Sequence, residues 1–174
     1  MAKRDLVRKN RIDYSGVRSI ESLPVVISWM RITLLNLLDN AIKYSWADRD
    51  VRVIATEDNR GRISIKVTNW GVGLPEKDQQ HIFDPYFRSD TPDARGARPG
   101  TGIGLTIVKE VVERIHKGRV TVTSIPYRKS EQSTIQIIDI EHETSFTIEL
   151  ERKILDSLAK SVYLREKNSN GQPS

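Results

Sequence analysis

Residues 36–45 of the chain read NLLDNAIKYS and combine a leucine-rich helical pattern with an unusual set of polar side chains. At 100° per residue, one stripe of this helix carries Asn36, Asn40, Lys43 and Tyr44. The opposite side carries the apolar residues Leu34, Leu35, Leu38, Ala41 and Ile42. Asn is a poor helix former, because its side chain competes for backbone hydrogen bonds. Two asparagines one turn apart therefore indicate a role beyond solvation.

Glycine clusters flank residues 84–100, which are rich in Pro, Gly, Asp and Arg and show no apolar periodicity. Gly71 and Gly73 precede this segment, and GTGIGL, residues 100–105, follows it at the start of a helical pattern. Glycine lets backbone amides approach a ligand closely, and free N–H groups at a helix N-terminus favour anions. A single G-x-G also occurs in tight turns, but the order of polar stripe, glycine turn, basic loop and second glycine turn predicts an anion site.

The rest of the pattern shows which elements would position these residues. Helical periodicity follows Pro24, and a second helix is expected over residues 106–116. Alternating apolar residues predict a hairpin of strands 51–56 and 62–68. A first strand, a short helix and three later strands are expected at residues 11–17, 76–83, 119–125, 133–140 and 144–150. Helices interleaved with hairpins predict an α+β two-layer sandwich, with the helices on one face of a mixed, mostly antiparallel sheet.

Length and composition predict one domain with irregular ends. In 174 residues we expect a disordered or linker N-terminus at 1–11, a folded domain at 12–152, and a C-terminal helix with a disordered tail at 153–174. Lys and Arg exceed Asp and Glu by only 28 to 23 and are spread along the chain, so no nucleic-acid partner is expected. The absence of cysteine excludes disulfides and Cys-based metal sites. No apolar run approaches the length of a membrane span, which favours a cytoplasmic domain, whether or not the full-length protein is attached to a membrane.

Four segments together carry a family resemblance. They are LLNLLDNAIKYS, VTNWGVGLP, HIFDPYFRSD and GTGIGLTIVKEVVE, in that order along the chain. They resemble the N, G1, F and G2 boxes of the ATP-binding catalytic domain of sensor histidine kinases, which shares the Bergerat fold with type II topoisomerases, Hsp90 and MutL. The resemblance spans roughly residues 30–120 and is far more specific than any one motif. It implies a domain that binds ATP and Mg²⁺, with residues 84–100 as the ATP lid.

The resemblance also implies a role for each matching residue. Asn40 would ligate Mg²⁺, Asn36 would lie near the ion, and Lys43 would meet phosphate oxygens. Arg88 would reach the transferring phosphoryl group from the lid. Tyr44 would pack beside the base or ribose, although its ring is equally well explained as half-buried core. The residues implied to shape the base pocket, to anchor the lid or to hold the phosphates are Asn69, Gly71, Gly73, Phe83, Phe87, Thr101, Gly102, Ile103, Gly104 and Leu105.

Position 36 separates the branches of this superfamily. In the hydrolysing branches a glutamate there activates water, whereas the amide of Asn36 has no useful basicity. The remaining route is transfer of the γ-phosphoryl group of ATP to an external nucleophile. The resemblance implies that this nucleophile is a histidine on a separate dimerisation and phosphoacceptor module, with a response regulator downstream, and we expect the isolated domain to be monomeric. We interpret His81, His116 and His142 as structural, so the phosphoacceptor is not expected in this chain. The alternatives are a nucleotide-binding interaction or sensor module without transferase activity and, third, a hydrolysing ATPase.

The sequence departs from the family pattern at two places. Asn69 stands where the G1 box usually has an aspartate that accepts a hydrogen bond from the adenine amino group. An uncharged acceptor weakens that bond, so ATP affinity is expected to fall on the order of tenfold. Alternatively, the amide could donate to guanine O6 and accept from guanine N1–H, and competition between ATP and GTP would test this hypothesis. The second departure is a long connection at residues 126–143, which predicts an extended hairpin and offers a docking surface.

Overall fold

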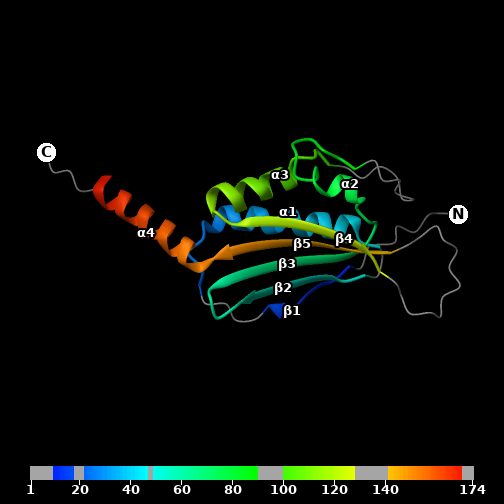
Figure 1. Ribbon diagram of the computed structural model, residues 1–174, viewed down its shortest axis with the longest axis horizontal. Coiled ribbons are helices and arrows are strands. Elements are labelled where there is room, and N and C mark those ends of the chain that lie inside the picture. Colours follow the sequence, from blue (N-terminus) through cyan, green and yellow to red (C-terminus); the bar gives the residue numbers. More distant parts are fainter. Residues whose placement is uncertain (1–9, 18–21, 47–48, 90–99, 128–140, 170–174) are drawn as a thin grey trace, which may run out of the picture.

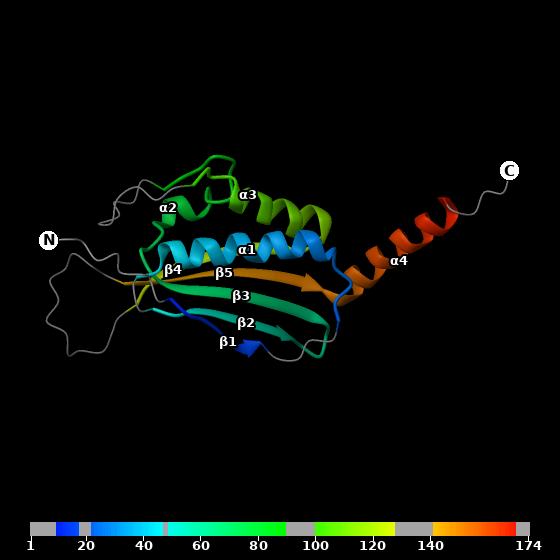
Figure 2. The same ribbon diagram turned by 180° about the vertical axis from the view of Figure 1, so that it is seen from behind.

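The computed structural model describes residues 10–17, 22–46, 49–89, 100–127 and 141–169. Its sheet has the strand order β1-β2-β3-β5-β4, in which β1 pairs with β2 in parallel and every other pairing is antiparallel. The strands are β1 (Ile12–Val17), β2 (Val51–Glu57), β3 (Arg62–Gly71), β4 (Arg119–Pro126) and β5 (His142–Glu151). Figures 1 and 2 show that α1, α2 and α3, which follow β1 and precede β4 in the chain, all lie on one side of this sheet. The predicted α+β two-layer sandwich is confirmed.

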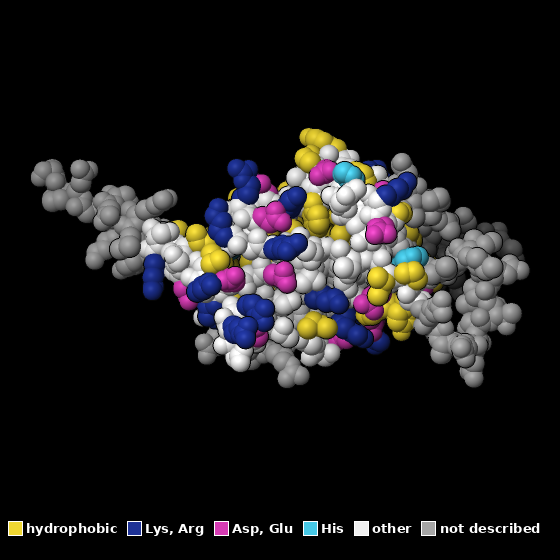
Figure 3. Space-filling view, in the orientation of Figure 1, with side chains coloured by type: hydrophobic (Ala, Val, Ile, Leu, Met, Phe, Trp, Pro, Cys, Tyr) yellow, Lys and Arg dark blue, Asp and Glu magenta, His cyan; other side chains and the backbone are white. Residues whose placement is uncertain are grey.

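Two long helices and three short helical segments complete the fold. They are α1 (Ile27–Tyr44), α2 (Glu76–Gln79), α3 (Gly104–Lys109), the π-helix η1 (Glu110–Ile115) and α4 (Arg152–Ser169). Helix α4 leaves the sandwich where β5 ends (Figure 2). Basic and acidic side chains are interspersed on the face in Figure 3. Within the described residues, no helix combines the length and apolar character needed to cross a bilayer.

The hydrophobic core lies between the sheet and α1. Met30, Leu37 and Ala41 of α1 are buried against strand residues such as Val67 and Ile148. The prediction that Leu35 belongs to the buried side was wrong, because its side chain is 55% exposed. Leu35 and Leu37 are two positions apart, which is 200° around a helix, so only one of them can face the sheet. The polar stripe was predicted opposite the apolar face, but it lies to one side of the buried face, because the buried Leu37 and Ala41 are only one position, or 100°, beyond Asn36 and Asn40.

The predicted helix at residues 106–116 is divided into α3 and η1. The His116 N–H donates to the Val111 carbonyl oxygen at 3.1 Å, a five-residue spacing that widens the last turn. This widening buries both Val111 and Val112 and turns the His116 ring inward. Its Nδ1 donates to the Val111 carbonyl at 2.9 Å, and its Nε2 accepts from the Val26 N–H at 3.2 Å, beside the start of α1. His116 therefore has the structural role that was predicted.

Other predictions differ from the structure at their boundaries or fall outside the described residues. The short helix expected at residues 76–83 ends at Gln79, and turns follow it. Helix α4 begins at Arg152 and continues to Ser169, so it takes up most of the region 153–174 in which a helix and a disordered tail were expected. The central part of the expected lid, at 90–99, and the expected strand at 133–140 lie outside the described residues. The predicted hairpin is confirmed as β2 and β3, with Val53 opposite Val67.

An ion pair joins the β2–β3 hairpin to α4, and its contribution to stability depends on pH. Arg152 donates from Nε and Nη2 to Glu57 at 2.5 and 2.6 Å, and this hydrogen bonding lowers the pKa of the Glu57 carboxyl. Because the pKa is lower in the folded than in the unfolded chain, the pair stabilises the fold above the ordinary glutamate range, and this stabilisation is lost as the pH falls through it. The Tm difference between the wild type and Glu57→Gln should therefore shrink between about pH 7 and about pH 3.5. A difference that does not vary with pH would contradict this explanation.

Candidate nucleotide-binding site

One pocket lies between α1, the end of β3, residues 87–89 and the start of α3. The predicted site residues that line it are Asn36, Asn40, Lys43, Tyr44, Asn69, Gly73, Phe87, Arg88, Thr101, Gly102, Gly104 and Leu105. They come from four separate stretches of sequence, and the sheet with its helical layer brings these together at the end of the sandwich opposite α4 (Figure 1). The polar stripe and the two glycine segments therefore face the same cavity.

The stripe on α1 forms one wall of this pocket. Asn36 donates from Nδ2 to the Ile32 carbonyl at 2.9 Å, which directs its Oδ1 away from the helix backbone. That oxygen is turned toward the start of α3, because a Cβ added at Gly104 would lie 2.6 Å from it. The Lys43 Nζ lies beside Gly100 and 5.6 Å from the centre of the Tyr44 ring. The amide oxygen of Asn36 and the ammonium group of Lys43 thus lie next to Gly104 and Gly100 of the glycine segment, residues 100–105.

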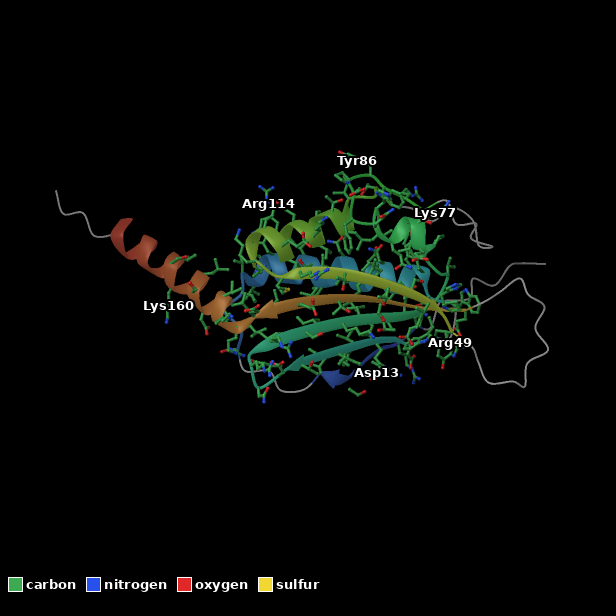
Figure 4. All side chains as sticks on the ribbon, viewed as in Figure 1. Asp13, Arg49, Lys77, Tyr86, Arg114 and Lys160 are labelled. Carbon is green, nitrogen blue, oxygen red and sulfur yellow. The ribbon has the colours of Figure 1, made fainter. Side chains whose placement is uncertain are left out.

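Gly102 gives the glycine segment its shape. Its φ is +73°, and a Cβ there would lie 2.8 Å from backbone atoms of Tyr86. The Tyr86 N–H donates to the Gly102 carbonyl at 3.1 Å, so the two ends of the expected lid meet here. Tyr86 itself is 73% exposed and lies at the outer edge of the helical side (Figure 4). A residue with a side chain at position 102 would strain the turn and push these ends apart.

Gly71, Phe83 and Ile103 were predicted as binding residues but do not line the pocket. Gly71 packs against the C-terminal end of α1, where a Cβ would lie 2.1 Å from the Tyr44 carbonyl oxygen. Phe83 is buried and meets Phe146 edge to face, with ring centroids 6.3 Å apart. Ile103 is the N-cap residue of α3. These residues hold the pocket walls in place instead of facing a ligand.

Gly71→Ala should destabilise the fold by about 1–3 kcal/mol, since the added methyl group would overlap with backbone that cannot rotate away. Because the same contact fixes the end of α1, nucleotide affinity should fall as well. Thermal unfolding and nucleotide titration would measure both effects. Gly16→Ala is a matched control in β1, because its nearest neighbour is a methylene of the Ile54 side chain at 2.8 Å, which can shift. Equal effects of the two substitutions would contradict this role of Gly71.

Sequence reasoning missed part of the lining. The missed residues are Asp39, Val72, Leu74, Ile82, Ser89, Thr144 and Phe146. Thr144 and Phe146 belong to β5, which places Thr144 opposite Asn69 in the neighbouring strand. No local pattern identifies such residues, because they enter the site through strand pairing between distant segments.

The pocket has two chemically different ends. At one end, Asn36 and Lys43 lie beside the glycine segment at residues 100–105, and Asn40 and Arg88 line the same pocket. The other end is lined mainly by apolar side chains, namely Val72, Leu74, Ile82 and Phe146, together with Asn69. Free N–H groups at the start of the helix formed by α3 and η1 add positive potential at the first end. The arrangement suits a ligand with a flat apolar ring and a polyanionic tail.

The residues at the polar end also fit a hydrated Mg²⁺ ion. Asn36 and Asn40 offer neutral amide oxygens, which are hard donors. The described residues contain no group of three or more His, Cys, Asp or Glu side chains that could hold a metal. Mg²⁺ suits such a sparse donor set, because it keeps several waters and takes further ligands from phosphates.

Comparison with known proteins identifies the family. Residues 26–154 match the family described as histidine kinase-, DNA gyrase B-, and HSP90-like ATPase, which is well over half of the chain. The chain therefore belongs to this ATPase family, and its mixed sheet with a one-sided helical layer is the fold expected for it.

Within the family, similar curated proteins include histidine kinases of signal transduction. The histidine-protein kinase ArlS of Staphylococcus haemolyticus is 38% identical over 52% of this chain and 19% of its own length. The sensor-like histidine kinase SenX3 of Mycolicibacterium smegmatis is 41% identical over 53% of this chain and 23% of its own. The mycobacterial sensor histidine kinase MprB has a solved structure that is 27% identical, covers 81% of both chains and has a TM-score of 0.58. The chain spans about a fifth of the length of these curated relatives.

Proposed function

We propose that the chain is the ATP-binding catalytic domain of a sensor histidine kinase and transfers the γ-phosphoryl group of ATP to a histidine on a separate dimerisation and phosphoacceptor module. A response regulator would accept the group next, and the reaction would take place in the cytoplasm, where ATP is available. The observation that carries this proposal is the pocket described above. At one end, the polar stripe of α1 faces the glycine segment at residues 100–105. At the other end, apolar side chains lie around the buried amide of Asn69.

We assign one part of the nucleotide to each end of the pocket. The purine base lies at the apolar end, and the triphosphate lies between α1 and the glycine segment. Lys43 and Arg88 neutralise charge on the phosphates, which stabilises the transition state of transfer. Asn40, with Asn36 beside it, would hold Mg²⁺. When bound, the ion screens the negative charge of the phosphate oxygens.

Asn36 is not suited to activating water. Its Nδ2 already donates to the Ile32 carbonyl, and an amide oxygen is too weakly basic to take a proton near neutral pH. Transfer therefore depends on positioning an external nucleophile in line with the γ-phosphate. For this reason we favour phosphoryl transfer over hydrolysis.

The histidines of this chain are poorly placed to be that nucleophile. None of the three lines the pocket. His81 contacts Asp84 through Nδ1 at 2.9 Å, His116 is buried under α1, and the His142 ring packs against Gly73. A phosphoacceptor supplied by another module agrees with these positions.

An exposed apolar strip on α1 supports a helical partner. Ile32 and Leu35 are 39% and 55% exposed and lie on α1 four residues and one residue before Asn36. Apolar side chains of this kind pack well against an amphipathic helix. A phosphoacceptor helix bound here would lie next to the phosphate end of the pocket.

The test is transfer from γ-labelled ATP to a histidine phosphoacceptor hairpin supplied in trans with Mg²⁺. The expected product is an acid-labile, base-stable label on the hairpin, with slow ATP hydrolysis when the hairpin is absent. ATP binding without labelling would instead favour a nucleotide-binding interaction or sensor module. Brisk hydrolysis by the chain alone would favour an ATPase and contradict the role given to Asn36.

A further inference from the structure

A hydrogen bond ties the pocket wall at residues 87–89 to helix α2. The Ser89 hydroxyl donates to the Asp78 carboxylate, which lies eleven residues earlier in the chain. Ser89 lines the pocket and directly follows Arg88, whereas Asp78 does not line it. A hydrogen bond to a carboxylate is about twice as strong as one between neutral groups, and this one is partly shielded from water. Asp78 can therefore influence a bound nucleotide, but only through the residues that it holds.

The residue on the other side of Arg88 is held as well. The Phe87 N–H donates to the Asp84 carbonyl at 3.2 Å, and the Phe87 ring lies 5.9 Å from the His81 ring. Arg88 itself has an exposed side chain, so close packing does not fix its direction. The backbone at Arg88 is thus fixed on both sides, by the turn after α2 and by the carboxylate of Asp78. These two contacts determine which part of the pocket the guanidinium group can reach.

Helix α2 is in turn anchored to the sheet. Gln79 donates from Nε2 to the Leu74 carbonyl at 3.2 Å and to the Ser124 carbonyl at 3.4 Å. The Ser124 hydroxyl oxygen accepts from the Leu74 N–H at 2.9 Å and shares a hydrogen bond of 2.8 Å with the Thr144 hydroxyl. A helix of four residues has little stability of its own, so these contacts fix its position. The Asp78 carboxylate therefore has a defined place relative to β4 and β5.

We propose that Asp78 is a positioning residue for phosphoryl transfer, which holds Arg88 toward the transferring phosphate through the hydroxyl of Ser89. This rests on the proposed function, since it requires Arg88 to neutralise charge on the phosphates. A cation stabilises a transition state best when it is in place before the reaction begins. Without the hydrogen bond, residues 87–89 move more freely and the guanidinium group is less often within reach of the phosphate. Transfer then slows, whereas ATP binding, which depends mainly on α1, the glycine segment and the apolar end, changes little.

The experiment measures two quantities for the intact chain with Mg²⁺. They are the Kd of ATP and the single-turnover rate of transfer from saturating ATP to a histidine phosphoacceptor hairpin. Asp78→Ala should slow transfer about tenfold and change the Kd less than about threefold. Ser89→Ala removes the same hydrogen bond from its other side and should have the same effect. Ser89→Thr keeps the hydroxyl group and should transfer within about twofold of the wild-type rate.

The variant Arg88→Met separates a positioning role from a structural one. If Asp78 acts through Arg88, adding Asp78→Ala to Arg88→Met should leave the remaining transfer rate unchanged. A role in the fold alone would slow transfer by the same factor with and without Arg88. Asp78→Ala and Ser89→Ala combined should likewise be no slower than either alone. The matched control is Glu76→Ala, which removes an exposed carboxylate from the same helix and should transfer at the wild-type rate.

Each failure has a distinct meaning. If the wild type transfers the phosphoryl group and a folded Asp78→Ala transfers equally fast, the inference is overturned while the proposed function stands. The inference is likewise overturned if Ser89→Ala has no effect, or if the effect of either substitution persists in Arg88→Met. Should Asp78→Ala not fold, Ser89→Ala with and without Arg88→Met gives the same comparison. If the wild type binds ATP but labels no hairpin, the proposed function fails and the inference fails with it.

Discussion

Replacement of Asn40 by alanine is expected to reduce phosphoryl transfer from ATP to a histidine acceptor about a thousandfold. Asn40 lines the polar end of the pocket from the middle of the α1 stripe. Its amide oxygen is the donor that we assign to Mg²⁺, and a methyl group offers no lone pair in its place. Without the ion, the negative charge on the γ-phosphate would be less screened when the nucleophile approaches. Transfer rates under single-turnover conditions would measure the loss.

A second measurement on Asn40→Ala separates loss of the metal from loss of the fold. Titration of ATP with and without Mg²⁺ should show that the ion strengthens binding to the wild type but not to the variant. Thermal unfolding should change little, because Asn40 is only half-buried. Asn59→Ala, in the exposed β2–β3 turn, is the matched control and should transfer at the wild-type rate. Undiminished transfer by Asn40→Ala would contradict the role given to Asn40.

Lys43→Met should weaken ATP binding about 10- to 100-fold and slow transfer further. The substitution keeps an apolar stem and removes the ammonium group that lies beside Gly100 at the edge of the glycine segment. A hydrogen bond to a charged group contributes about 1.5–3 kcal/mol, and the phosphates would lose such a partner. Calorimetric titration with ATP and ADP would measure the change, and a larger loss for ATP would place Lys43 near the terminal phosphate.

Two controls sharpen the result for Lys43. Lys43→Arg keeps the charge and should recover part of the affinity, although a planar guanidinium fits a point contact less well. Lys160→Met removes a cation from α4, which projects away from the sandwich (Figure 4), and should leave binding unchanged. If Lys160→Met weakened ATP binding as much as Lys43→Met, the effect would be one of overall charge and not of a local contact.

Sequence reasoning succeeded for features that depend on neighbouring residues. The α1 stripe and the β2–β3 hairpin follow from periodicities of 3.6 and 2 residues, which hold wherever the element packs. The glycine segment could be recognised because a positive φ, as at Gly102, is costly for other residues. Sequence reasoning failed where neighbouring residues have the same polarity, because the pattern then does not show which of them is buried. Leu35 and Leu37 are equally apolar, and only packing against the sheet decides which of them is buried.

Only part of the lining of the pocket could be predicted from the sequence. Its polar end consists of residues in recognisable motifs, and the structure brings those residues together, whereas their roles toward ATP and Mg²⁺ remain predictions. Its apolar end depends on β5 lying beside β3, which brings Thr144 and Phe146 to Asn69. The π-helical turn that points His116 toward Val26 was also unexpected, because it depends on contact between two helices.

The amino-acid sequence alone determined the order of the elements, the polar stripe and the glycine turns, since each depends on conformational preferences within a few residues. Only the tertiary structure decided that Asn69 is buried with an unpaired donor at the apolar end of the pocket. That property arises from strand pairing and from the packing of distant side chains, which together exclude water from the amide and engage the hydroxyl groups around it. The local sequence cannot predict that water is excluded from this amide, because the exclusion depends on which distant segments pack together.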